Sequence, residues 1–90
     1  MDIDDWRKKI DKIDSNILKL LNERIMCVIK IAVIKKQEDI PVYIAEREEK
    51  IIEKLFKENN GPIEEVNIRN IFSMIFTESR RVQSKHFEQT

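Results

Sequence analysis

Seven polar side chains fall at positions where helical periodicity would place buried apolar residues, and together they could bind an anion. They comprise four cations, one carboxylate and two neutral hydrogen-bonding groups: Arg7, Arg24, Lys35, Arg47, Glu48, Ser79 and Gln83. A guanidinium keeps its proton in proteins and is costly to bury without an anionic partner. Because the inward cations outnumber the one inward carboxylate, the pattern favours a ligand that carries negative charge.

Each of these residues also has a structural interpretation, which is the more common one at any single position. Arg24 could pair with Glu48, and Lys35 could extend to solvent along the apolar surface. Ser79 could bond back to its own helix, and Arg7 could lie on an exposed flank. Only the combination favours a ligand pocket over structural roles.

Other kinds of active site have little support in the sequence. His86, the only histidine, lies near the C-terminal end, and no Cys/His cluster predicts a metal site. Gly61, the only glycine, sits in a helix stop and not in a nucleotide-binding loop. We therefore expect no metal and no cofactor, and any catalysis would proceed without a nucleophile.

The composition limits the partners and the compartment. The 17 basic and 17 acidic residues cancel, which argues against a general nucleic-acid or anionic-membrane binder. The single cysteine, Cys27, is expected to be a small core hydrophobe in a reducing compartment. The acidic start of the chain is no signal peptide, and charges interrupt every apolar run that could span a bilayer. We expect a cytoplasmic protein.

The polar side chains lie on three predicted helices, long, short and long, in an all-α fold. These helices cover about residues 5–36, 44–58 and 63–87. Pro41 ends the first helical segment, and the Asn-Asn-Gly-Pro run at residues 59–62 separates the other two. The last residues, 87–90, are expected to fray.

The first helix carries two apolar rows. One consists of Trp6, Ile10, Ile13, Ile17, Leu20, Cys27, Ile31 and Ile34, and its neighbour of Leu18, Leu21, Ile25, Val28 and Ala32. Arg24 fills a place in the first row, and Arg7 and Lys35 close the second. This helix would be roughly 48 Å long, whereas a compact chain of 90 residues has a radius of gyration of about 12 Å. Its projecting rows need a second chain, and a homodimer is the simplest solution.

A homodimer would also complete the pocket. Arg7 and Arg24 are about 26 Å apart along one helix, too far to hold the same small molecule. Antiparallel pairing of two first helices about a twofold axis near Leu18 would bring Arg7 of the partner subunit between Arg24 and Lys35. Two equivalent cationic sites would result.

The sequence resembles the small all-helical chorismate mutases, isomerases that rearrange chorismate to prephenate in phenylalanine and tyrosine biosynthesis. The matching motifs are R-x-x-I-D-x-I-D at 7–14, L-L-x-E-R ending at Arg24, the lysine Lys35, P-V-Y and R-E within 41–48, and E-S-R-x-x-Q at 78–83. The resemblance implies that residues 1–90 form a single domain. It also implies that three-helix chains intertwine into a homodimer with a six-helix core.

The resemblance implies a role for each inward residue. Arg24 and Arg7 of the partner subunit would hold the two substrate carboxylates, and Lys35 and Gln83 would contact the ether oxygen of the breaking bond. The remaining three, Arg47, Glu48 and Ser79, match positions that contact the ring hydroxyl and other carboxylate oxygens. Arg24, Lys35 and Gln83 are thus the expected catalytic residues.

Ile44 departs from the family pattern, which usually has an aspartate there to contact the ring hydroxyl. Glu48 could hold that hydroxyl alone. The related isochorismate-pyruvate lyases also lack the aspartate, so a lyase is an alternative function, although they tend to lack the glutamate as well. A third hypothesis is a weakly active helical dimer that regulates a partner enzyme of aromatic biosynthesis.

Overall fold

The structure, a computed structural model, describes residues 1–88 and consists of three helices. They are α1 (Ile3–Gln37), α2 (Ala45–Glu58) and α3 (Glu65–Glu88), and the described residues contain no strand. The all-α prediction and the order of lengths are confirmed. The radius of gyration is 16.2 Å and the longest dimension is 53 Å. The described chain is therefore elongated, as the length of the first helix predicted.

α1 begins earlier than predicted because Asp2 caps it. The backbone N–H of Asp5 donates to Oδ1 of Asp2 at 3.0 Å, and that of Asp2 donates to Oδ2 of Asp5 at 3.1 Å. This reciprocal pair satisfies two amides that the first turn leaves without helical partners. At the other end, Asp39 adopts a left-handed conformation with φ 57°, and Pro41 follows. The connection to α2 starts there.

α3 begins two residues later than predicted because side chains of the preceding turn hold its backbone. Nδ2 of Asn59 donates to the carbonyl of Ile63 at 2.8 Å, and Gly61 takes φ +72°. Oδ1 of Asn67 then accepts from the N–H of Glu64 at 3.2 Å. At its C-terminal end α3 includes residues 87 and 88, where fraying was predicted wrongly, and residues 89 and 90 lie outside the described part.

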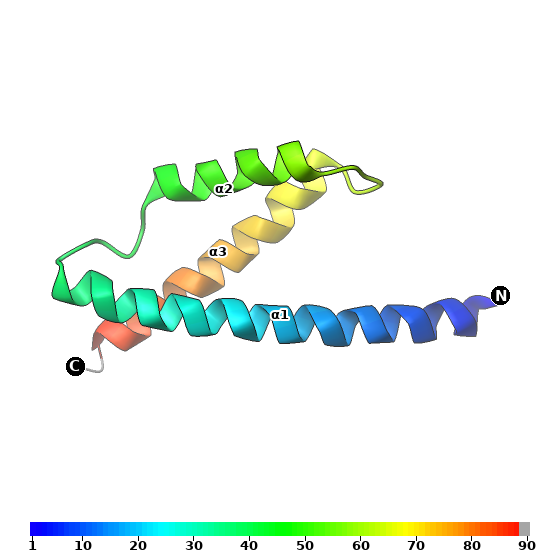
Figure 1. The fold of residues 1–90 in the computed structure, drawn as a ribbon, viewed down its shortest axis with the longest axis horizontal. Coiled ribbons are helices and arrows are strands. Elements are labelled where there is room, and N and C mark those ends of the chain that lie inside the picture. Colours follow the sequence, from blue (N-terminus) through cyan, green and yellow to red (C-terminus); the bar gives the residue numbers. More distant parts are fainter. Residues whose placement is uncertain (89–90) are drawn as a thin grey trace.

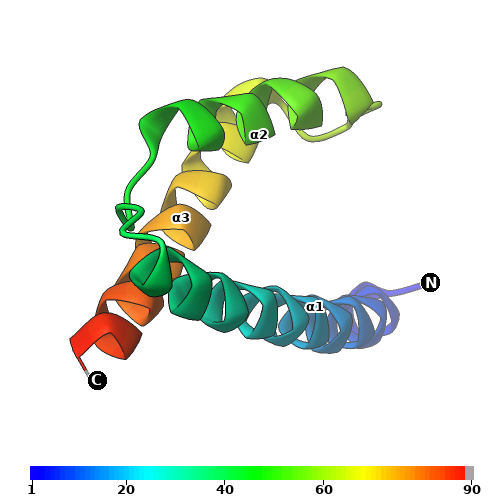
Figure 2. The ribbon, with the colours of Figure 1, turned by 60° about the vertical axis from the view of Figure 1, so that its left-hand side comes forward.

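α3 crosses between the other two helices and packs on both (Figures 1 and 2). In the described residues α1 and α2 make no direct backbone-level contact, so each is placed by α3. The buried apolar residues come from all three helices: Val28, Ala32, Ile52, Ile68 and Phe76. No described helix is long and apolar enough to cross a membrane.

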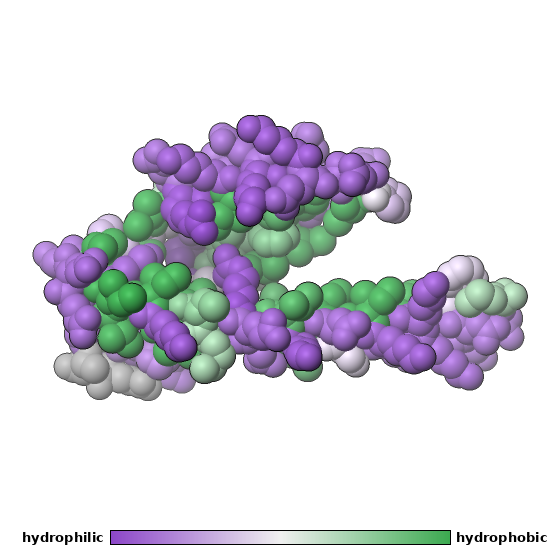
Figure 3. Space-filling view, viewed as in Figure 1, coloured by the Kyte–Doolittle hydropathy of each residue, from purple (hydrophilic) through white to green (hydrophobic). Residues whose placement is uncertain are grey.

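The N-terminal half of α1 extends away from both other helices (Figure 1). Its first apolar row is exposed in this single chain, with Trp6, Ile10 and Ile17 each about half accessible. Figure 3 shows hydrophobic surface along α1 where it extends away from the other helices. Cys27 is also exposed, so the prediction of a core cysteine is wrong for the chain by itself. Of the second row, Val28 and Ala32 are buried in the part of α1 that packs on α3, whereas Leu18 is 62% exposed.

Candidate functional site

A cavity of about 200 Å³ lies where the three helices come together. Six of the seven polar residues predicted to face inward line it: Arg24, Lys35, Arg47, Glu48, Ser79 and Gln83. Apolar residues complete the wall: Val28, Ile31, Val42, Ile44, Ile51 and Phe76. The helical periodicity therefore brought six of these polar groups to one space.

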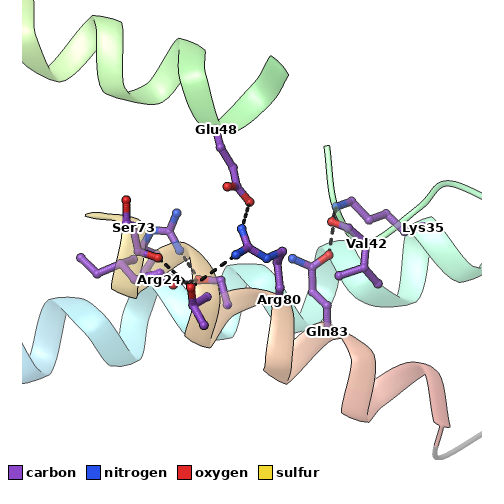
Figure 4. Close-up of polar contacts among 10 residues, drawn as sticks. Arg24, Lys35, Val42, Glu48, Ser73, Arg80 and Gln83 are labelled. Atoms are coloured by element: carbon purple, nitrogen blue, oxygen red, sulfur yellow. Dashed lines mark hydrogen bonds and ion pairs between the residues drawn. The ribbon is translucent and has the colours of Figure 1, made fainter. Parts of the chain in front are cut away.

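Arg24, labelled in Figure 4, and Ser79 join α1 to α3 in the lining of the cavity. Nη1 of Arg24 donates to Oγ of Ser79 at 2.5 Å, and this hydroxyl donates to the carbonyl of Ile75 at 2.8 Å. The guanidinium also lies over the ring of Phe76, 5.8 Å from its centroid. The predicted back-bond of Ser79 is thus confirmed, whereas the structural alternative of an Arg24–Glu48 pair is wrong.

The charge on Arg24 is disfavoured by its surroundings. Burial lowers the pKa of Arg24, the nearby Arg47 lowers it further, and Glu48 opposes both effects. A cation in this position is stabilised when an anion enters the cavity. The surroundings of Arg24 therefore favour an anion beside its guanidinium.

Lys35 and Gln83 form a second polar pair, at the C-terminal end of α1. Nζ of Lys35 donates to the carbonyl of Val42 at 3.0 Å and to Oε1 of Gln83 at 2.9 Å. Lys35 therefore points inward and not to solvent. Burial lowers the pKa of Lys35, and Glu48 partly opposes this effect. Because Lys35 contacts the oxygen of the Gln83 amide, the NH₂ group of Gln83 can donate to a ligand.

Glu48 faces the cavity from the first turn of α2, and its partner is Arg80. Nη1 of Arg80 donates to Oε2 of Glu48 at 2.5 Å. Arg80 also lines the cavity, although in the sequence it stood out only as the arginine of the E-S-R-x-x-Q motif and was given no role. A signal was present, because Arg80 follows Phe76 by one turn and precedes Gln83 by three residues on the same helix face. Arg47 lies beside Glu48 and is exposed.

Arg7 lies outside the cavity. Its guanidinium is exposed, and Nη1 is 3.8 Å from Oδ1 of Asp4 on the same helix. This placement agrees with the argument that one α1 cannot bring Arg7 and Arg24 to the same ligand. Arg7 could reach a cavity of this kind only from another chain.

The cavity can hold an anion and donate several hydrogen bonds to it. Its ionic lining consists of four cations, Arg24, Lys35, Arg47 and Arg80, against one carboxylate, Glu48. Among residues 1–88, no group of three or more His, Cys, Asp or Glu side chains is placed to hold a metal ion. The arrangement suits a small organic molecule with more than one negatively charged group.

Comparison of the sequence with known proteins gives a match over almost all of the chain. Residues 6–84 match the family described as chorismate mutase type II. The chorismate mutase of Methanocaldococcus jannaschii is 41% identical over 87 residues, which cover 93% of this chain and 86% of that protein. A bifunctional chorismate mutase/prephenate dehydratase of Aquifex aeolicus is 41% identical over 58 residues. This match covers 64% of this chain and 16% of that protein.

Solved structures with the fold of this chain are also named chorismate mutases. Form II of the chorismate mutase of Thermus thermophilus superposes with a TM-score of 0.89 and 34% identity, over 91% of this chain and 93% of that chain. The chorismate mutase of Helicobacter pylori, solved in complex with prephenate, gives a TM-score of 0.91 and 25% identity. That match covers 98% of this chain and 96% of the other.

Proposed function

The chain belongs to the chorismate mutase type II family, and we propose that the cavity between its helices is the site where it rearranges chorismate to prephenate. The convergence of Arg24, Lys35 and Gln83 in one cavity carries this proposal. Chorismate has two carboxylates and an ether oxygen. The cavity supplies cations for the carboxylates and hydrogen-bond donors for the ether oxygen.

The rearrangement is unimolecular, and the donors at Lys35 and Gln83 suit its transition state. The ether C–O bond breaks while a C–C bond forms in the same molecule, so no protein group takes a proton or forms a covalent bond. Negative charge develops on the ether oxygen, where Lys35 and the Gln83 NH₂ group would donate. The surrounding cations and walls would hold the substrate in its compact reactive shape.

The substrate carboxylates would contact the arginines of the site. Arg24 would bind one carboxylate. The Ser79 hydroxyl, to which Arg24 already donates, would hold the guanidinium in position. Glu48 would accept from the ring hydroxyl. Ile44 also lines the cavity, where it adds apolar wall in place of a second carboxylate. We propose that Glu48 alone holds the hydroxyl.

We propose that the chain works as a homodimer. The exposed apolar row on the N-terminal half of α1 would then be covered by the same row of a second chain. In antiparallel pairing, Arg7 of the partner subunit would reach the cavity beside Arg24. The second carboxylate of chorismate would bind there.

The bifunctional relative suggests a partner enzyme. Its name joins chorismate mutase to prephenate dehydratase, an enzyme that consumes the product of the first reaction. We propose that an enzyme acting on prephenate is the partner of this chain.

The proposed function is tested by following the loss of chorismate absorbance with purified protein and identifying the product. Isochorismate is assayed in parallel. Prephenate formed at an enzymatic rate supports the mutase. Pyruvate released from isochorismate, with little prephenate from chorismate, would instead make the chain a lyase, the alternative that Ile44 raises. If the protein alone forms no product from either substrate, but chorismate is converted once a prephenate dehydratase is added, the result would support a regulatory dimer.

We expect the activity to fall at alkaline pH as Lys35 loses its proton. Burial lowers its pKa from the ordinary value of 10.5, so the loss begins below the pH at which a free lysine titrates. A lowered lysine pKa opposes folding while the lysine is charged in both states, and this cost disappears as the pH rises. Unfolding caused by Lys35 therefore cannot explain the loss. The measurement is kcat/KM against pH.

Lys35→Arg is the control for this alkaline limb, because arginine keeps its proton throughout the range. In this variant the alkaline fall in kcat/KM should move to higher pH or disappear. An identical limb in this variant would assign the titration to another group.

We expect Gln83→Glu to make the reaction depend on acid. A neutral amide donates to the ether oxygen at any ordinary pH, whereas a carboxyl group donates only when it is protonated. The variant should be weak at neutral pH and recover as the pH falls. A pH profile parallel to that of the unmodified protein would show that Gln83 does not donate to the substrate.

A further inference from the structure

Arg80 makes contacts with three separate parts of the chain. Its Nη1 donates to Glu48 on α2, and its Nη2 donates to Oγ1 of Thr77 on α3 at 3.3 Å. Its guanidinium carbon lies 4.9 Å from the ring centroid of Tyr43, in the connection between α1 and α2. The guanidinium is thus held on several sides and has a defined orientation.

The Arg80–Glu48 contact connects helices whose relative placement decides the shape of the cavity. α1 supplies Arg24 and Lys35, and α2 supplies Glu48, but within residues 1–88 these helices pack on α3 and not on each other. Figure 4 shows the Arg80 side chain extending from α3 toward the Glu48 carboxylate, beside Gln83. The bridge thus adds a side-chain contact to the α2–α3 packing that places Glu48 relative to the α1 cations.

Arg80 uses only one oxygen of the Glu48 carboxylate. The contact is to Oε2, and a carboxylate has two oxygens that can accept hydrogen bonds. Oε1 can accept from a substrate hydroxyl while Oε2 stays on Arg80. A substrate carboxylate that drew Arg80 away from Oε2 would break this contact. Glu48, largely buried, would then face a dianion without its cation.

We propose that Arg80 is a positioning residue of the site, which holds Glu48 by Oε2 so that Oε1 accepts from the ring hydroxyl of the substrate. The inference rests on the proposed function. Arg80 acts through Glu48 and does not bind the substrate carboxylates. The ring of Tyr43 contacts the guanidinium, and the Glu48 contact ties the first turn of α2 to α3.

The test is a double-mutant cycle on chorismate turnover with Arg80→Met, Glu48→Gln and the double variant. Methionine keeps an unbranched apolar stem and removes the guanidinium. We expect Arg80→Met to lower kcat/KM on the order of tenfold to a hundredfold, the size of a lost charge-assisted hydrogen bond. Its split between KM and kcat should match that of Glu48→Gln. The kcat/KM of the double variant should be no lower than that of the less active single variant.

Arg81→Met is the matched control. Arg81 is the next residue on α3, its side chain is 70% exposed, and it pairs with Glu78 on the same helix. We expect it to retain normal kcat/KM. Arg80→Lys should recover part of the activity lost in Arg80→Met, because it restores a cation near Oε2. If Arg80→Met does not fold, the cycle is run with Arg80→Lys, which should cost nothing further in the Glu48→Gln background.

Additive losses of Arg80→Met and Glu48→Gln would overturn the proposal, as would an Arg80→Met variant as active as Arg81→Met. These outcomes are distinct from failure of the proposed function. In that case the unmodified protein itself would form no prephenate, whereas overturning the role of Arg80 requires an active unmodified protein.

Discussion

Arg24→Ala should lower kcat/KM for chorismate on the order of a hundredfold to a thousandfold. The change removes a guanidinium that projects into the cavity and donates to Ser79. A carboxylate bound in a partly enclosed cavity has no solvent to replace this lost contact. The substrate would bind more weakly and in a less well defined orientation, so we expect KM to rise and kcat to fall. Steady-state kinetics on purified protein measures both.

Lys35→Ala should have an effect of the same order for a different reason. Lys35 would place its positive charge where charge develops on the ether oxygen, so its loss should appear mainly in kcat. The contact of Lys35 with the Gln83 oxygen is lost as well, which frees the amide to turn. Both variants should be checked by thermal unfolding.

Arg69→Ala is the control for both cavity variants. Arg69 resembles Arg24 in lying over a phenylalanine ring, Phe56, at 5.5 Å, but it pairs with Glu49 and does not line the cavity. This variant should show near-normal turnover. Near-normal turnover in Arg24→Ala or Lys35→Ala would refute the assignment of the cavity as the active site.

The helices could be predicted because their signals are local. Apolar periodicity, the Asn-Asn-Gly-Pro stop and Pro41 placed the helix ends within about two residues of those observed. The remaining errors arise from side-chain capping. Asp2 caps α1 and starts it two residues earlier than predicted, and Asn59 and Asn67 delay the start of α3. Which of several capping side chains is used depends on the geometry of the turn.

Most of the polar residues that line the cavity could be predicted, but Arg80 and the pairings could not. Periodicity assigns a residue to a helix face, which was enough to bring Arg24, Ser79 and Gln83 into one cavity. It says nothing about how far apart two faces lie. Glu48 carries the opposite charge to Arg24, yet among the described residues no backbone-level contact joins α2 to α1, and Arg80 on α3 pairs with that carboxylate instead. The family match confirms the resemblance in the motifs, while the roles of individual residues await the variants above.

Mixing Arg7→Ala with Arg24→Ala should restore activity that neither variant has alone. In the proposed dimer each site takes Arg24 from one chain and Arg7 from the other. A mixed dimer therefore has one site with both arginines intact and one site with neither. Random exchange of equal amounts makes half of the dimers mixed, so about a quarter of the normal specific activity should return.

The control is a mixture of Arg24→Ala with the double variant Arg7→Ala/Arg24→Ala. It forms mixed dimers equally well, but none of its sites contains Arg24, so activity should stay at the level of the single variant. Native mass spectrometry of both mixtures measures subunit exchange independently of activity. Exchange without recovery in the first mixture would show that Arg7 does not complete the site of a partner. The exposed row on α1 would then be an interface without a catalytic role.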